Sequence, residues 1–342
     1  MVNINKQNTL SVLSVKTGQS LALNSNSKVD LELRPLFSEF INEKRYASKA
    51  SKETLRGYQS TFDLFAKLMP DVGLTDLTST NMTEFFSLIE KRVRIIGKGK
   101  TKRGVKISSI ATYRSKLNTF FDWLTENGHI ESSPFSKMKY PKVYYDDRQY
   151  LKKQDMEKIF LAISFNIKWA NHFIECRNLA IFGLAFYCGL RKGELLGLKI
   201  HNIDIKRKQI EVSSQTSKSR RQRVVPINVK LLDILKTYLQ ERKKTAVSDA
   251  HLFISDNRKH EFTSFGLKHL MEKVKTASGV NFHIHQLRHT FAVNLLNNGT
   301  DIAKIKQLMG HQDIRMTATY LRCLPAKAMQ MDLENLTLDN LI

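Results

Sequence analysis

Residues 285–320 constrain the fold more than any other stretch, because they combine a helical repeat with two glycines that can end helices. One face of the predicted helix is polar, with residues spaced by three and four: His285, Arg288 and His289. The opposite face is apolar and is predicted to pack into a core: Leu287, Phe291 and Leu295. Gly299 should end this helix, Asp301 can cap a second one, and Gly310 should end that one in turn.

The residues after the second glycine carry the chemistry of this stretch. His311 follows Gly310 directly, and Tyr320 comes nine residues later in a predicted third helical segment. A tyrosine hydroxyl near histidine and arginine side chains is suited to phosphoryl transfer. The same helices also fit a helix-turn-helix DNA reader, in which His311 and Tyr320 are ordinary surface residues. The stretch alone leaves both interpretations open.

The charge of the chain narrows the choice of partner. Its 342 residues include 55 Lys and Arg against 32 Asp and Glu, a net charge of +23. That excess indicates a polyanionic partner, most simply nucleic acid, with an anionic membrane as the weaker alternative. The longest apolar run, residues 179–190, is shorter than the roughly 20 residues that cross a bilayer. Three cysteines without metal-ligand spacing and an N-terminus without an apolar signal segment predict a cytosolic protein.

The length of the chain favours two domains, since one core rarely serves beyond about 250–300 residues. We expect residues 1–28 to form a loose tail and residues 29–130 to form a helical domain. The second of its four predicted helices has the clearest repeat: Leu55, Tyr58, Phe62, Phe65 and Met69. The third is predicted to extend as far as Val93, and the fourth to end at Gly128.

Between the third and fourth predicted helices lies a run of cations without an acidic residue. Glycines within it would let the backbone approach a phosphate chain closely. We therefore predict a loop that contacts DNA through five residues: Lys98, Lys100, Lys102, Arg103 and Lys106. A simple solvated loop is the alternative.

Residues 131–148 contain two prolines and no helical repeat, which predicts a linker. A second domain, residues 149–325, is predicted to be mostly helical with a small antiparallel sheet. Its strands, 209–213 and 223–227, are joined by a basic turn. Further DNA contacts are predicted at this turn: Arg220, Arg221 and Arg223. The acidic tail, residues 326–342, is predicted to dock as a short helix on a protein surface, with a frayed end as the alternative.

Four separated motifs in a fixed order resemble the tyrosine recombinase (phage-integrase-type) family. They are YCGLRKGELLGLK from Tyr187, a turn lysine eight residues before Pro226, HQLRHTFA from His285, and MGH followed by Tyr320. The resemblance covers about residues 29–325. It implies a mainly α protein with a helical core-binding (SAM-like) domain and an α+β catalytic domain, which together form a C-shaped clamp on DNA. The basic insert at residues 98–106 departs from the family pattern.

The resemblance assigns a role to each matching residue. Arg191 and Arg288 are the arginines that hold the phosphate, with Glu194 supporting Arg191. Tyr320 is the nucleophile, and His285 and His311 are the active-site histidines. Lys218 is the hairpin lysine, a candidate general acid for the departing 5′-oxygen.

The chemistry that the resemblance implies needs neither a metal nor ATP. Two guanidinium groups can stabilise the charge that builds on the phosphate oxygens, and no carboxylate cluster in the sequence suits Mg²⁺. The family acts as a homotetramer on two synapsed double-stranded DNA sites, through a 3′-phosphotyrosyl intermediate and a Holliday junction, with accessory DNA-bending proteins in some systems. We expect the same in a bacterial cytoplasm, at the nucleoid. A type IB topoisomerase-like enzyme and a non-enzymatic DNA-binding regulator are the alternatives.

Overall fold

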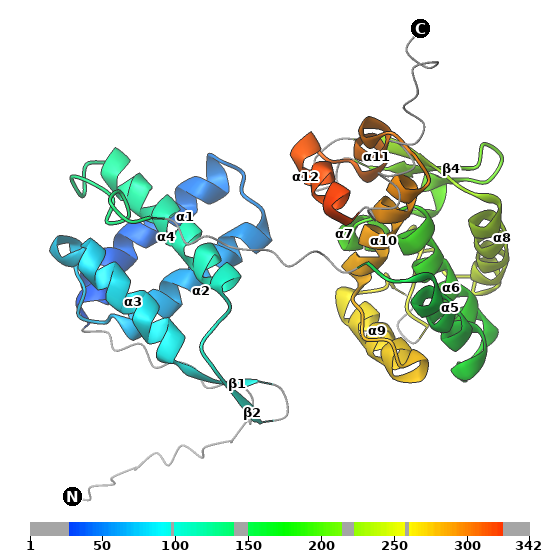
Figure 1. Cartoon of the computed structure of the whole chain (residues 1–342), viewed down its shortest axis with the longest axis horizontal. Helices are drawn as coiled ribbons and strands as arrows, with labels where there is room; N and C mark the ends of the chain where they lie inside the picture. The colour runs from blue at the N-terminus through cyan, green and yellow to red at the C-terminus, as the bar shows by residue number, and fades with distance from the viewer. Residues whose placement is uncertain (1–26, 97–98, 140–149, 214–221, 257–259, 324–342) are drawn as a thin grey trace, which may run out of the picture. The chain divides into compact units, whose positions relative to one another are not determined.

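The computed structural model describes residues 27–96, 99–139, 150–213, 222–256 and 260–323 (Figure 1). The chain forms two compact units, residues 1–144 and 145–342. Both are built mainly from helices, as predicted, and a small antiparallel sheet lies in the second. Within the described residues, no helix combines the length and apolar character that spanning a bilayer requires.

The N-terminal unit is a helical domain with one β-hairpin. Its elements are η1 (Val29–Leu33), α1 (Arg34–Tyr46), α2 (Lys52–Leu68), η2 (Leu74–Asp76), α3 (Ser79–Lys91), β1 (Val93–Ile96), β2 (Lys100–Arg103) and α4 (Ile107–Glu126). The side chains of Ser51 and Thr78 cap α2 and α3 by accepting backbone N–H groups. The core is largely aromatic, and the rings of Phe37 and Phe62 stack with centroids 4.0 Å apart.

The basic run between α3 and α4 forms a hairpin, where the sequence predicted a loop. Helix α3 ends at Lys91, so the predicted extension of the third helix to Val93 is wrong. Val93 instead begins β1 and pairs with Arg103 of β2. The four-residue step from Ile89 to Val93 fits a helix, but the pairing of β1 with β2 prevails over that local repeat.

The C-terminal unit packs its helices around the buried helix α6. Its elements are α5 (Lys153–Leu161), η3 (Ala162–Asn166), α6 (His172–Tyr187), α7 (Lys192–Leu196), η4 (Ile200–Asn202), β3 (Ile203–Asp204), β4 (Gln209–Val212), β5 (Arg223–Pro226), α8 (Val229–Lys244), α9 (Ser264–Ser278), α10 (Ile284–Asn297), α11 (Ile302–Met309), α12 (Ile314–Ala318) and η5 (Thr319–Cys323). Helix α6 lies against α8 and α10 (Figure 1). The strands form an antiparallel sheet in the order β3-β4-β5.

Helix α10 ends, and α11 begins and ends, as the sequence predicts. Asp301 caps α11 by accepting N–H groups of Ala303 and Lys304, and Gly310 ends it in the left-handed region at φ +64°. The predicted division of α10 into a polar and an apolar face is only partly right. Arg288 and His289 are buried, as Leu287 is, because α10 packs against α6, α11 and η5.

Candidate active site

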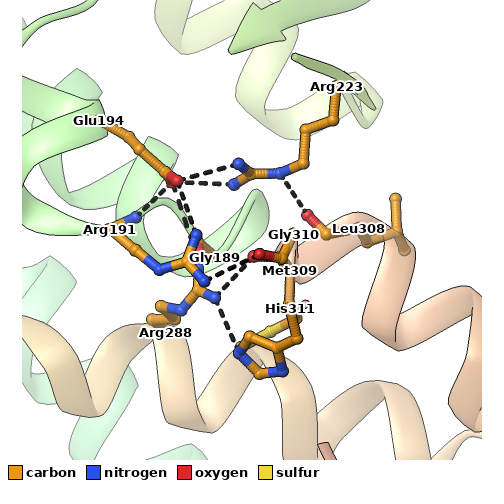
Figure 2. A network of polar contacts seen from close by, with 9 residues as sticks. All are labelled: Gly189, Arg191, Glu194, Arg223, Arg288, Leu308, Met309, Gly310 and His311. Carbon is orange, nitrogen blue, oxygen red and sulfur yellow. Dashed lines mark hydrogen bonds and ion pairs between the residues drawn. The ribbon is translucent and has the colours of Figure 1, made fainter. Parts of the chain in front are cut away.

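Glu194 is the centre of a buried network of charged groups (Figure 2). Its carboxylate accepts the backbone N–H of Arg191 at 2.9 Å, which caps the short helix α7, and the Arg191 guanidinium at 2.8 Å. Arg223 of β5 donates to both carboxylate oxygens, at 2.9 and 2.8 Å. Burial alone would raise the pKa of Glu194. The hydrogen bonds and charge of Arg223, with the bonds from Arg191, outweigh burial and lower that pKa to about 2.

Three successive carbonyl groups at the C-terminal end of α11 each accept a hydrogen bond from a different arginine (Figure 2). Leu308 accepts from Arg223 Nε at 2.8 Å, Met309 from Arg288 at 2.7 Å, and Gly310 from Arg191 at 2.9 Å. The carbonyls at a helix C-terminus lack intrahelical partners and carry partial negative charge, so they are suited to cations. The end of α11 therefore holds all three guanidinium groups together.

Gly310 is required by this arrangement for two reasons. Its positive φ favours glycine, and a Cβ atom here would lie 2.9 Å from an Arg223 guanidinium nitrogen. A larger residue would therefore strain the helix end and displace Arg223.

Arg288 is buried between two backbone segments. Its guanidinium donates to the carbonyls of Gly189 and Met309 and to Nε2 of His311, the last at 3.0 Å. Burial lowers the pKa of Arg288 to about 9, with a further contribution from the charge of Arg191. The guanidinium is still charged at neutral pH.

The contacts of His311 define its tautomer. A guanidinium only donates, so Nε2 of His311, which faces Arg288, is the unprotonated nitrogen. Nδ1 then carries the proton and donates to Oγ1 of the buried Thr317 at 2.8 Å. His311 is therefore neutral in this arrangement, with Nε2 directed toward Arg288.

Tyr320 lies in η5, next to this network. Its ring is stacked on that of His311 at a centroid distance of 6.1 Å and lies 4.8 Å from the ring of His289. The tyrosine is 4% exposed, within a cluster that includes Val293 and Met309. A groove of about 740 Å³, lined in part by Arg223, Gly310 and His311, opens beside the network.

The structure brings together five of the predicted site residues: Arg191, Glu194, Arg288, His311 and Tyr320. His285, at the start of α10, is exposed. Lys218, Lys98, Arg220 and Arg221 lie outside the described residues. Four predicted DNA contacts are exposed in the N-terminal unit, on or beside the hairpin: Lys100, Lys102, Arg103 and Lys106.

Arg223 has a different place from the predicted one. It was expected to contact DNA, but its side chain is 7% exposed and its guanidinium is engaged by Glu194 and Leu308. Sequence reasoning also missed the carbonyl acceptors and Thr317. Gly310 was the one sequence signal for the carbonyl acceptors, since a left-handed helix end leaves its last carbonyls without helical partners.

One group of potential metal ligands occurs among the described residues. Asp249, His251 and Glu261 bring three ligand atoms within 4.8 Å of one another. They lie between α8 and α9 in the chain, on a segment that contributes no residue to the arginine network.

Two sequence profiles match the chain. The profile of the phage integrase family matches residues 149–327, and that of the phage integrase SAM-like domain matches residues 32–140. Tyrosine recombinase XerC of Oceanobacillus iheyensis is 25% identical over 295 residues, covering 84% of this chain and 92% of the relative. XerC of Thermodesulfovibrio yellowstonii is 29% identical, covering 83% and 90%.

Solved structures agree in fold. The XerH site-specific recombinase bound to palindromic difH substrate has a TM-score of 0.69 at 18% identity, covering 86% of this chain and 82% of its own. A lambda integrase dimer bound to a COC' core site has a TM-score of 0.64 at 20% identity, covering 84% and 94%.

Proposed function

The chain belongs to the phage integrase family, and from that premise we propose that it is a site-specific DNA recombinase with Tyr320 as its nucleophile. It breaks and rejoins DNA strands through a 3′-phosphotyrosyl intermediate and a Holliday junction, without metal or ATP. The observation that carries the assignment of the site is the convergence of Arg191, Arg288 and His311 at the end of α11, beside the ring of Tyr320.

In the proposed reaction, the hydroxyl oxygen of Tyr320 attacks the phosphorus of a phosphodiester. A phosphotyrosyl bond forms, and the 5′-oxygen leaves and takes up a proton to become a hydroxyl. The 5′-hydroxyl of the partner duplex then attacks the phosphotyrosine and releases the tyrosine. The energy of the original bond is kept in the intermediate, so no external energy source is consumed.

Arg191 and Arg288 are the proposed stabilisers of the transition state. Their bonds to carbonyls and to Glu194 hold both guanidiniums before the substrate arrives, so little reorganisation is needed as charge builds on the phosphate oxygens. His311, whose unprotonated Nε2 faces Arg288, is a proposed acceptor of the tyrosine proton. His285 is the proposed second histidine, and Lys218 the proposed acid for the 5′-oxygen.

The proposed partner is double-stranded DNA at recombination sites. The net charge of +23 supports it, and the solved XerH and lambda integrase relatives were captured on such substrates.

We assign core binding to residues 29–130, linkage to 131–148 and catalysis to 149–325. A homotetramer on synapsed DNA, with residues 326–342 docked between subunits, completes the proposal, and accessory DNA-bending proteins are further candidate partners. The bacterial relatives support action at the nucleoid, in the cytoplasm. Mass measurement of the protein–DNA complex tests the tetramer, and a dimer as the largest species contradicts it.

The test of the function is to sequence the DNA that stays covalently attached when the purified protein is incubated with a genomic fragment library and denatured. Adducts at a defined site, with a free 5′-hydroxyl opposite the attachment, are expected. Adducts at random positions indicate a topoisomerase, and their absence contradicts a recombinase.

A further inference from the structure

The β1–β2 hairpin is joined firmly to the end of α3. The N–H of Gly104 donates to the carbonyl of Arg92 at 2.8 Å, and the Arg94 guanidinium donates to the carbonyl of Gly104 at 2.7 Å. Gly104 has φ +67°, and a Cβ here would lie 2.8 Å from the backbone oxygen of Glu90. The close packing at the base holds the ribbon in a defined direction, and Figure 1 shows it projecting from the helices of its unit.

The pairing register gives the ribbon two different faces. Residues opposite each other in an antiparallel pair share a face, so Val93 lies beside Arg103 and Ile95 beside Thr101. The other face carries the pair Arg94 with Lys102, and Lys100 also belongs to it. One face is therefore apolar with an arginine at one end, and the other is mainly basic.

The apolar face of the ribbon contacts no core. Val93 is 62% exposed and Ile95 is 81% exposed, although both are paired in regular register with β2. Residues 91–106 contain no acidic residue. This density of positive charge opposes the pairing of two such ribbons and favours a polyanion with apolar groups of its own.

We propose that this hairpin lies in the major groove of DNA beside the cleavage site and reads thymine methyl groups through Val93 and Ile95. A two-stranded ribbon fits the groove, which is about 12 Å wide, and aliphatic side chains distinguish thymine by its methyl group. Arg103, on the same face, is placed to bind guanine. Lys100 and Lys102, on the opposite face, are long enough to reach the phosphates along the groove walls. The proposal rests on the proposed function, since it takes DNA as the substrate.

The test uses the duplex recovered in the covalent adduct and copies in which each thymine is replaced by uracil, which removes only the methyl group. Uracil at one or more positions flanking the cleavage site should weaken binding by the wild-type protein by about fivefold to tenfold. The Val93→Ser/Ile95→Ser variant changes two exposed side chains, so its fold is not threatened. It should bind thymine and uracil duplexes equally. Equal sensitivity of the variant and the wild type to uracil overturns the proposal.

A second measurement separates phosphate contacts from base contacts. Lys100→Gln/Lys102→Gln should lower the slope of log K against log salt by about 1.8, at roughly 0.9 per phosphate contact, and leave the uracil effect unchanged. The control pair Lys52→Gln/Lys67→Gln, on exposed positions of α2, should leave the slope within about 0.3 of the wild-type value, since neither lysine is assigned a phosphate contact. Equal slope changes in both pairs overturn the assignment.

Two further outcomes distinguish this proposal from the proposed function. Wild-type protein that forms no adduct on any duplex contradicts the recombinase itself. Normal adduct formation with no uracil effect at any flanking position contradicts only the hairpin. Binding to phosphatidylglycerol vesicles that is lost in Val93→Ser/Ile95→Ser, with unchanged duplex affinity, would assign the face to a membrane and overturn the proposal.

Discussion

Positive charge is handled in opposite ways in the two units of this protein. In the C-terminal unit, the guanidiniums of Arg191, Arg223 and Arg288 are largely buried, and each has at least two acceptors from Glu194, backbone carbonyls or His311. On and beside the hairpin of the N-terminal unit, Lys100, Lys102, Arg103 and Lys106 are exposed. In the proposed function both regions serve DNA, Arg191 and Arg288 in the reaction at a phosphate and the hairpin cations in binding.

The difference follows from what each group must do. A cation that stabilises a transition state has to be in place beforehand, and burial strengthens its field because water is excluded. The cost of burying it is offset here by Glu194 and the carbonyls of α11. A cation that supplies affinity works through release of counterions and can stay mobile and hydrated. The rate of strand cleavage should therefore depend on the buried arginine network, and the affinity for DNA should depend on the exposed cations.

The largest difference between the effects on cleavage and on DNA affinity is expected from Tyr320→Phe, which removes one oxygen. Covalent adducts on a nicked suicide substrate should disappear, and DNA affinity in a gel shift should remain within about twofold, because it rests mainly on phosphate contacts elsewhere. Adducts at the wild-type level would assign the nucleophile to another residue.

Lys218→Ala tests whether the cation at this position, between β4 and β5 in the sequence, acts in cleavage or in DNA binding. Cleavage should slow by about 10²–10⁴-fold, as is typical when a general acid is lost. A substrate whose 5′-bridging oxygen is replaced by sulfur needs no protonation on leaving, so it should largely restore the rate. Without that rescue, Lys218 is at most a phosphate contact and belongs with the exposed group.

The sequence predicted Arg223 as a DNA contact, whereas the structure places it in the buried arginine network. Arg223→Lys keeps the charge but cannot bind both oxygens of Glu194 and the Leu308 carbonyl together. If Arg223 positions the other residues of the network, this variant should lower kcat for cleavage by about 10²-fold and leave KM nearly unchanged, because a small misplacement of catalytic groups slows the reaction.

The matched control is Arg207→Lys, on an exposed turn of the same unit, which should change neither constant. Unfolding curves of both variants show whether the fold is intact. A rise in KM with unchanged kcat would return Arg223 to the DNA contacts that the sequence predicted.

The pH dependence of the free energy of unfolding tests the buried network around Glu194 alone. The pKa of Glu194 is about 2 in the folded protein, below the ordinary value near 4.3. The ionised carboxylate therefore adds stability above about pH 4.3, and this is lost as pH falls toward 2. The expected contribution is about 3 kcal/mol, since one pKa unit corresponds to roughly 1.4 kcal/mol.

Chemical denaturation at pH 6, 4 and 3 measures this contribution. The difference between wild type and Glu194→Gln should shrink as pH falls, because other carboxylates titrate alike in both proteins. Glu272→Gln, at an exposed position of α9, should give a curve parallel to the wild type. A constant difference between wild type and Glu194→Gln would show that Glu194 is not the titrating group.

Much of the fold could be predicted because its signals are local. The helix ends at Asp301 and Gly310 follow from a side-chain cap and a left-handed conformation, both decided within four residues. The hairpin could not be predicted in the same way. Its glycines and charges also fit a loop, and the step from Ile89 to Val93 fits a helix, so only the pairing of β1 with β2 resolves the choice.

By itself, the sequence determined which residues carry reactive groups and where the short elements that hold them begin and end. His311 follows Gly310, and Tyr320 lies one short helix further along, because these are features of neighbouring residues. Only the tertiary structure decided which arginine does what. Arg223 and the cations of the hairpin carry the same charge and look alike in sequence. Arg223 meets Glu194 from 29 residues away and Leu308 from 85 residues away. Burial and pairing across such distances depend on how the whole unit packs, and no local pattern encodes them.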